Sequence, residues 1–158
     1  MLSTESRSLV LNAWRTFAER DEASIAGQFT EDFEWVGPMG NATSRALDIP
    51  LPMKGPATVA HFLAIRMRQL YRSMRVDITG VFADGDTVVV EETTEARLPN
   101  GAAYKLDYCL IFKCRDGKIC QVREYMDTLG QERQVYASDP WAVEGHAEAP
   151  SSAPAEPA

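Results

Sequence analysis

Residues 103–127, AYKLDYCLIFKCRDGKICQVREYMD, decide the fold of this chain. Apolar and polar residues alternate on both sides of the pair Asp116-Gly117, an arrangement typical of a β-hairpin. Aromatic and leucine side chains fill one face of the first segment: Tyr104, Leu106, Tyr108, Leu110 and Phe112. Because side chains alternate between the two faces of a strand, this face is predicted to point into the protein.

The second segment of the hairpin carries a carboxylate on its apolar face. Glu124 shares that face with Val122 and Met126, whereas Arg123 and Tyr125 lie on the other. A carboxyl group in apolar surroundings resists ionisation, so its pKa is expected to be raised unless a cation or several donors hold the charge. Such a group can act as a general acid or base near neutral pH. The alternative is a glutamate that pairs with an arginine or reaches solvent at the sheet edge.

Two further polar side chains are candidates for the same interior. Arg66 projects from the apolar side of a helix predicted over residues 56–72, where it could pair with Glu124 or hold an anionic substrate group. Alternatively, its stem covers core while the guanidinium reaches solvent. Tyr108 faces inward and could donate a hydrogen bond to an enolate or carbonyl oxygen, or equally to a main-chain carbonyl as a packing residue.

The strand predicted over residues 87–98 has two possible registers. Apolar alternation favours the inward placement of the even-numbered residues, including Glu92 and Thr94. The opposite register places Glu91 and Thr93 inward. Because a slip of one residue moves every side chain to the other face, both assignments stay open.

The rest of the chain predicts helices first and an antiparallel meander afterwards. Two helices are expected over residues 3–20 and from Asp21, followed by a short strand ending at Gly37-Pro38 and a proline-rich loop at a pocket mouth. This order indicates an α+β domain with segregated layers, in which a curved sheet and helices enclose an apolar pocket. We expect the domain to span residues 1–137, and residues 138–158, rich in alanine, proline and glutamate, to be a disordered tail.

Composition and charge limit the classes of partner. The chain has 158 residues and a net charge of −7, with 16 lysines and arginines against 23 acids. Acids that follow Arg133, the last lysine or arginine, supply much of that charge, so the folded part is nearly neutral and nucleic acid is not an expected partner. No stretch approaches the roughly 20 apolar residues of a membrane span, and the N-terminus lacks a secretory signal, so a cytoplasmic location is expected. Three cysteines without a CxxC pattern and two histidines predict no metal site.

Three segments resemble a known superfamily: residues 29–38 (FTEDFEWVGP), 53–62 (MKGPATVAHF) and 116–127 (DGKICQVREYMD). They resemble the nuclear-transport-factor-two-like superfamily, and within it SnoaL-like proteins related to ketosteroid isomerase and limonene epoxide hydrolase. The resemblance implies a cone-shaped α+β barrel, with three N-terminal helices packed on a strongly curved antiparallel or mixed sheet that encloses a pocket. It also implies a homodimer formed through the sheet, for which the chain offers Ile111, Ile119 and Tyr125 on the predicted outer face.

Compared position by position, the chain departs from both relatives. Gly37 stands where ketosteroid isomerase has its aspartate base, and Tyr108 falls where that enzyme has a protonated aspartate. Limonene epoxide hydrolase uses an Arg-x-Asp pair, which an ungapped match places at Glu91 and Thr93, and an aspartate that matches Glu124. Its water-activating trio is therefore incomplete here.

The resemblance to SnoaL-like cyclases implies acid/base chemistry without a metal or cofactor. We expect an isomerase, cyclase, dehydratase or epoxide hydrolase that acts on a hydrophobic cyclic, polyketide- or terpenoid-like molecule, with Glu124, Tyr108 and Glu91 as catalytic residues. The predicted substrate-binding residues are Trp14, Phe17, Trp35, Phe62, Arg66, Thr93, Leu106, Val122 and Met126. The alternative is a small-molecule-binding protein of the same fold without chemistry.

Overall fold

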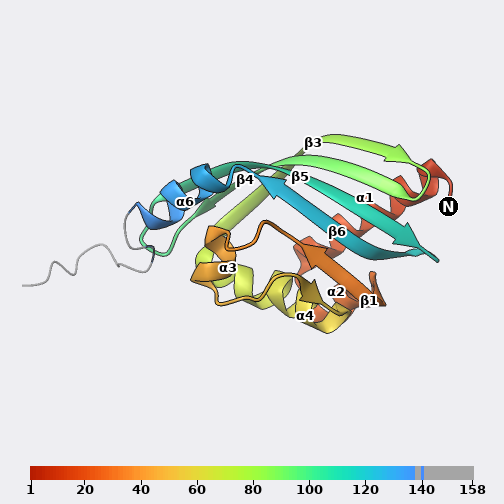
Figure 1. Cartoon of the computed structure of the whole chain (residues 1–158), viewed down its shortest axis with the longest axis horizontal. Helices are drawn as coiled ribbons and strands as arrows, with labels where there is room; N and C mark the ends of the chain where they lie inside the picture. The colour runs from red at the N-terminus through yellow and green to blue at the C-terminus, as the bar shows by residue number, and fades with distance from the viewer. Residues whose placement is uncertain (138–139, 141–158) are drawn as a thin grey trace, which may run out of the picture.

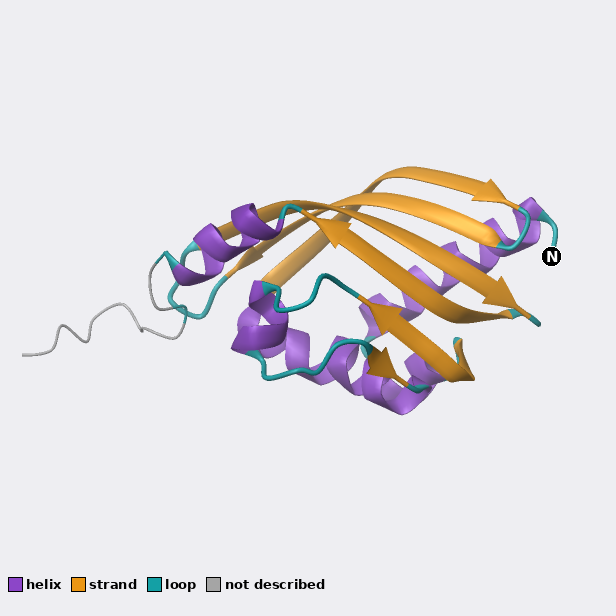
Figure 2. Ribbon diagram, in the orientation of Figure 1, coloured by secondary structure: helices purple, strands orange, loops and turns teal. Residues whose placement is uncertain are grey.

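The computed structural model describes residues 1–137 and 140, and the tail predicted over residues 138–158 lies, apart from Pro140, outside the described part. Helices come first in the chain and long strands afterwards, as Figures 1 and 2 show. The helical elements are α1 (Ser3–Glu19), α2 (Glu22–Ala26), α3 (Ala42–Ala46), α4 (Pro56–His61), the π-helix η1 (Phe62–Arg66), α5 (Met67–Leu70) and α6 (Thr128–Tyr136). The strands are β1 (Phe29–Val36), β2 (Met53–Lys54), β3 (Arg72–Asp84), β4 (Thr87–Arg97), β5 (Ala103–Arg115) and β6 (Lys118–Met126).

The strands form one mixed sheet in the order β2-β1-β6-β5-β4-β3. Strand β1 runs parallel to β6, and every other neighbouring pair is antiparallel. The sheet does not close on itself: it arches over the helices and keeps β3 as a free edge (Figure 1). The predicted α+β cone with N-terminal helices under a strongly curved sheet is confirmed.

The first helix turns its apolar side toward the sheet. Val10 and Ala13 are fully buried and Phe17 nearly so, because they recur on one side of a 3.6-residue helix. Serines at its start tie the helix to the β3–β4 turn: the Ser6 hydroxyl donates to the Gly85 carbonyl at 2.7 Å, and the Gly85 N–H donates to Ser3 Oγ at 2.9 Å. The helix therefore lies along the concave side of the sheet, starting from this hairpin.

The third predicted helix is interrupted. Instead of one α-helix over residues 56–72, a π-helical turn joins α4 to α5, with the Met67 N–H bonded to the Phe62 carbonyl. π-Helical turns are rare in proteins, and those that occur are often found at functional sites. The chain after β1 also contains two elements that the sequence did not predict, α3 and β2, and α6 follows the last strand.

A β-bulge corrects one prediction about the outer face. Pairing between β5 and β6 shifts between Lys113 and Cys114, so that Cys120 is the extra residue. Ile119 consequently faces the core with 0% of its surface exposed, and it cannot serve an outer-face contact. Tyr125 keeps the predicted outward position and is 50% exposed.

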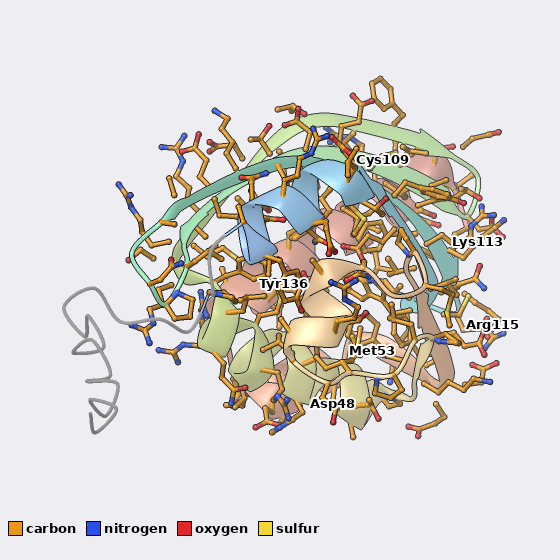
Figure 3. The ribbon with its side chains drawn as sticks, turned by 60° about the vertical axis from the view of Figure 1, so that its left-hand side comes forward. Asp48, Met53, Cys109, Lys113, Arg115 and Tyr136 are labelled. Carbon is orange, nitrogen blue, oxygen red and sulfur yellow. The ribbon has the colours of Figure 1, made fainter. Side chains whose placement is uncertain are left out.

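Charged side chains lie outside and apolar ones between sheet and helices. Lys113 and Arg115 project from the outer surface in Figure 3, where they form ion pairs with Asp86 and Asp32. Met53, by contrast, is 2% exposed. The space beneath the arch is only partly filled by this core, which leaves room for a cavity.

Candidate functional site

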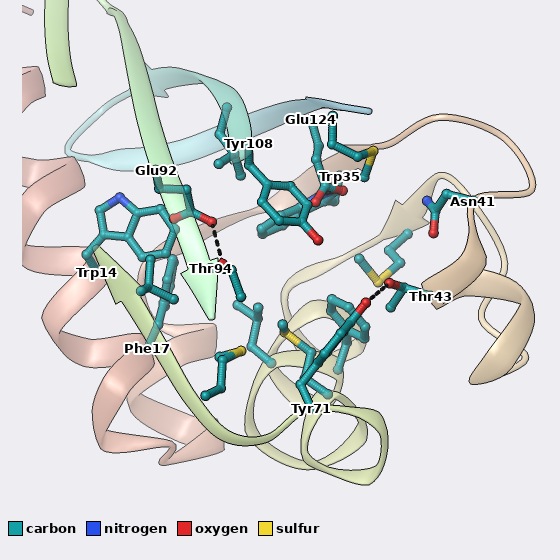
Figure 4. A pocket seen from close by; sticks show the side chains of 18 of the residues that line it. Trp14, Phe17, Trp35, Asn41, Thr43, Tyr71, Glu92, Thr94, Tyr108 and Glu124 are labelled. Atoms are coloured by element: carbon teal, nitrogen blue, oxygen red, sulfur yellow. Dashed lines mark hydrogen bonds between the residues drawn. The ribbon is translucent and has the colours of Figure 1, made fainter. Parts of the chain in front are cut away.

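A cavity of about 340 Å³ lies between the concave face of the sheet and the helices. Its volume is in the range of pockets for small organic molecules. Most of its walls are apolar, from Trp14 and Phe17 on α1, Trp35 on β1, Phe62 on η1 and Met126 at the end of β6. All five were predicted as substrate-binding residues, and the structure brings them together around one space. Figure 4 labels three of them, Trp14, Phe17 and Trp35.

Glu124 lies in this apolar wall. Burial raises its pKa from 4.5 to about 7, although the Trp35 indole N–H, which donates to Oε2 at 3.2 Å, acts in the opposite direction. Gly37 makes room for the carboxylate, because a Cβ atom there would lie 3.0 Å from Glu124 Oε2. The inward orientation and raised pKa agree with the prediction made from the alternation of residues in the hairpin.

A second carboxyl group, that of Glu92, lines the same cavity. It is 7% exposed, and its pKa is also raised to about 7, first by burial and then by the nearby charge of Glu124. The Thr94 hydroxyl donates to Oε1 at 3.3 Å, whereas Oε2 is buried without a hydrogen-bond partner among the described residues. One carboxylate oxygen is thus left unpaired in a nearly dry setting.

Glu91 and Thr93 do not face the cavity, and their predicted placement is wrong. Glu91 is exposed, and the Thr93 hydroxyl donates to Asp107 at 2.6 Å on the outer face. The register is decided by Val88 and Val90, both with 0% of their surface exposed, which bury the even-numbered face of β4. The register that apolar alternation favoured is the one observed.

Tyr108 lies between the two carboxyl groups on the concave face, opposite Glu92 in the pairing of β4 with β5 (Figure 4). Its hydroxyl is 2.6 Å from the Tyr104 hydroxyl and accepts from Gln131 Nε2 at 3.4 Å. Burial raises the pKa of this phenol well above its ordinary value, so it stays protonated. It is therefore suited to donate a hydrogen bond to a developing oxygen charge.

Gln131, which was not predicted as a site residue, forms hydrogen bonds with polar groups at the cavity wall. It is fully buried on α6, accepts from the Ala42 N–H at 2.9 Å and donates to the Thr43 hydroxyl at 3.0 Å. Thr43 in turn lies 2.6 Å from the Tyr71 hydroxyl, and both line the cavity. The only sequence signal for this arrangement was the proline-rich loop, whose residues form α3 at the pocket wall.

Besides Thr93, three predicted binding residues do not line the cavity. Leu106 and Val122 are buried in core packing, at 8% and 0% exposure. The Arg66 guanidinium donates to the Leu47 carbonyl, away from Glu124, and its Nε is buried without a partner among the described residues. The π-turn is the reason, since it places Phe62, Leu63 and Met67 along the cavity and turns Arg66 aside.

Neither a metal cluster nor a membrane span appears within the part of the chain that the structure describes. Among residues 1–137 and 140, no three histidine, cysteine, aspartate or glutamate side chains lie together as a metal site would need. No helix in the same residues is long and apolar enough to cross a bilayer.

An open, curved mixed sheet over helices, with carboxyl groups and a phenol around an apolar hollow, defines a cone-shaped domain of the nuclear-transport-factor-two-like type. The chain belongs to the SnoaL-like domain family, whose model matches residues 10–122. None of the curated proteins matches the chain.

Solved structures share the fold over most of their length. TerC co-crystallised with polyporic acid is 26% identical, with a TM-score of 0.72 over 84% of this chain and 98% of that chain. A proposed SnoaL-like polyketide cyclase from Jannaschia sp. is 16% identical, with a TM-score of 0.71 over 86% and 94%. An LEH-like epoxide hydrolase from M. tuberculosis is 22% identical, with a TM-score of 0.63 over 85% and 95%.

Proposed function

We propose that this protein is a cofactor-independent acid/base enzyme for a hydrophobic cyclic small molecule of polyketide or terpenoid type. The observation that carries the proposal is Glu124, a carboxyl group with a pKa of about 7 in the wall of an apolar cavity. A carboxyl group of this pKa can take up and release a proton at neutral pH. Isomerisation, cyclisation, dehydration and epoxide opening all need such a group.

The geometry assigns a role to each polar side chain. Glu124, as carboxylate, removes a proton from a carbon next to a carbonyl or from a water molecule, while the Trp35 N–H holds its orientation. The Tyr108 phenol donates to the oxygen on which negative charge develops, and Glu124 then returns the proton. Glu92 is the second acid: because a charged Glu124 raises the pKa of Glu92, Glu92 tends to stay protonated while Glu124 is the carboxylate.

The similar proteins support a ligand of this class. TerC was crystallised with polyporic acid, and other structures of the same fold belong to a proposed polyketide cyclase and an epoxide hydrolase. A base and a phenol in an apolar cavity are compatible with all four reaction types.

The test is proton exchange at an activated carbon. We expect the protein to accelerate deuterium incorporation into 2-tetralone, a neutral enolisable bicyclic ketone, when followed by proton NMR in D₂O. Glu124→Gln should lower the enzyme-dependent rate by about 100-fold or more, the usual contribution of a general base. Glu91→Gln is the matched control, because Glu91 is exposed on the other face of the sheet, and it should keep the rate. A rate that survives Glu124→Gln would remove Glu124 from the mechanism.

A binding protein without chemistry is the second candidate. It is favoured by Gly37, which stands where related isomerases have their aspartate base. The same experiment separates the two, since a binding protein would take up 2-tetralone without accelerating its exchange.

We also propose that the protein forms a homodimer through the outer face of the sheet. Phe82, 60% exposed, and the partly buried Val89 and Ile111 follow one another across neighbouring strands on that face. A monomeric mass in light scattering at micromolar concentration would contradict this proposal.

A further inference from the structure

Arg20 is the basic residue of the cavity. It follows α1 directly, is partly buried and lines the same space as the two carboxyl groups. No other lysine, arginine or histidine of the described residues lines that space. A cation at the wall of an apolar cavity is costly unless it has a partner.

The Arg20 guanidinium has no such partner within residues 1–137 and 140, where it makes neither a hydrogen bond nor an ion pair. Nearby acids are engaged elsewhere. The Asp21 carboxylate accepts from the Ser24 N–H at 2.8 Å, and Glu22 pairs with His61 at 3.2 Å. The donors of Arg20 are therefore available to a bound molecule.

The backbone conformation at position 20 does not favour an arginine. Its φ of 61° is in the left-handed region, where the chain ends α1 with the Arg20 N–H bonded to the Phe17 carbonyl at 3.3 Å. Glycine is the favoured residue at such a helix end, and an arginine is disfavoured. A residue that is unfavourable for the backbone and faces a cavity indicates a role for the side chain.

Arg20 lies where the cavity is open to solvent, at the end of α1. Ser6 is bonded to Gly85 at the β3–β4 turn, and Arg20 lies about 21 Å further along the helix direction. Along β3, Ile78 lies about 23 Å back from Gly85 by the rise of a strand, so Arg20 and Ile78 are at similar distances from the β3–β4 turn. Ile78 and Ala18 line the cavity and are exposed, so the cavity is open to solvent at this edge, which we take as its entrance.

We propose that Arg20 binds the anionic group of an otherwise apolar substrate, and that the substrates are ring-containing acids. This inference rests on the proposed function and names its substrate class. The planar guanidinium matches a carboxylate or another anionic oxygen group with two parallel hydrogen bonds. The carboxyl groups of Glu92 and Glu124 disfavour an anion deeper inside, so the acidic group stays at the entrance and the rings extend toward Glu124.

Two fluorescent probes that differ by one group test the proposal directly. 8-Anilinonaphthalene-1-sulfonate and N-phenyl-1-naphthylamine share a ring system, but only the first carries an anionic group. The wild-type protein should bind the sulfonate more tightly. Arg20→Gln should weaken sulfonate binding about tenfold, the effect of losing one charged hydrogen-bonded pair. Binding of the neutral amine should change by less than about twofold, because it does not need the guanidinium.

Matched variants separate an anion site from general effects. Arg15→Gln removes an exposed charge from the same helix and should leave both affinities unchanged. Arg20→Gly relaxes the left-handed backbone, so it should melt no lower than wild type and still lose the preference for the sulfonate. Equal affinity of the wild-type protein for both probes, or an equal loss of both in Arg20→Gln, would overturn the proposal. Neither probe binding nor thermal melting depends on catalysis. The probes can therefore refute the anion site while the exchange experiment supports the proposed function, and the exchange experiment can refute the proposed function while the probes support the anion site.

Discussion

The two faces of the sheet shift the pKa of a glutamate in opposite directions. On the concave face, burial raises the pKa of Glu92 and Glu124 to about 7. On the outer face, the Lys105 ammonium donates to Glu95 at 2.7 Å and lowers the pKa of that carboxyl. Glu91 and Glu92 are neighbours in sequence, yet one is exposed and the other 7% exposed. The pKa of a glutamate in this sheet therefore depends on the face it occupies, not on the strand it belongs to.

The largest expected effect is a dependence of stability on pH that originates on the concave face. Because the folded pKa values of Glu92 and Glu124 exceed the ordinary 4.5, the folded chain binds protons more strongly than the unfolded chain between pH 4.5 and about 7. The free energy of unfolding should therefore fall as pH rises through this window and level off above it. Each carboxyl group accounts for about 3 kcal/mol of the fall.

Urea unfolding at about pH 5 and about pH 8 measures this slope. Glu92→Gln should remove about half of the fall, because glutamine does not ionise. Glu91→Gln should leave it unchanged. Acids with lowered pKa, such as Glu95, lose their stabilisation only below their ordinary pKa, and so outside the window. If Glu91→Gln and Glu92→Gln reduce the pH dependence of the free energy of unfolding equally, the proposed difference between the two faces is wrong.

A smaller effect extends the comparison to uncharged polar groups. Gln131→Leu should lower the free energy of unfolding by about 2 kcal/mol, since the buried Ala42 N–H loses its acceptor. Gln134→Leu is the control on the same helix, where the hydrogen bonds to Lys105 are exposed, and it should cost less than about 1 kcal/mol. Thermal or urea unfolding of both variants checks the difference, and equal losses would contradict it.

The smallest predicted effect sharpens the account of Glu124. Trp35→Phe removes the N–H that lowers the pKa of this carboxyl, so the pKa should rise further, by about one unit. The pH profile of 2-tetralone exchange should move upward by the same amount. Trp14→Phe is the control: Trp14 also lines the cavity, but its indole N–H has no partner within the described residues. A profile that moves equally in both variants would point to a change in packing.

The inward faces of the C-terminal hairpin were predictable because alternation is a local property of a strand. Tyr108 and Glu124 share the apolar face in the sequence and line the cavity in the structure. The register of β4 was less certain, because glutamates and threonines follow one another at 91–94, and the buried valines decided it.

What alternation cannot tell is whether an inward residue meets a cavity or other side chains. Val122 faces inward as predicted, but it is fully buried in the core. Met126, four residues further along the chain, lines the cavity. Likewise, the helical arc that pointed Arg66 inward assumed a regular helix, and the π-turn invalidates that assumption.

By itself, the sequence determined the α+β class, the inward acid and phenol, and an apolar interior around them, since these follow from residue periods along single elements. Only the tertiary structure decided that Glu92 lines the cavity beside Glu124, that Gln131 is hydrogen-bonded to the Tyr108 phenol, and that Arg20 lines the same cavity. These three come from elements far apart in the chain, and their surroundings depend on how the sheet curves over the helices. Curvature and long-range packing are properties of the whole fold and leave no periodic signal in a short segment.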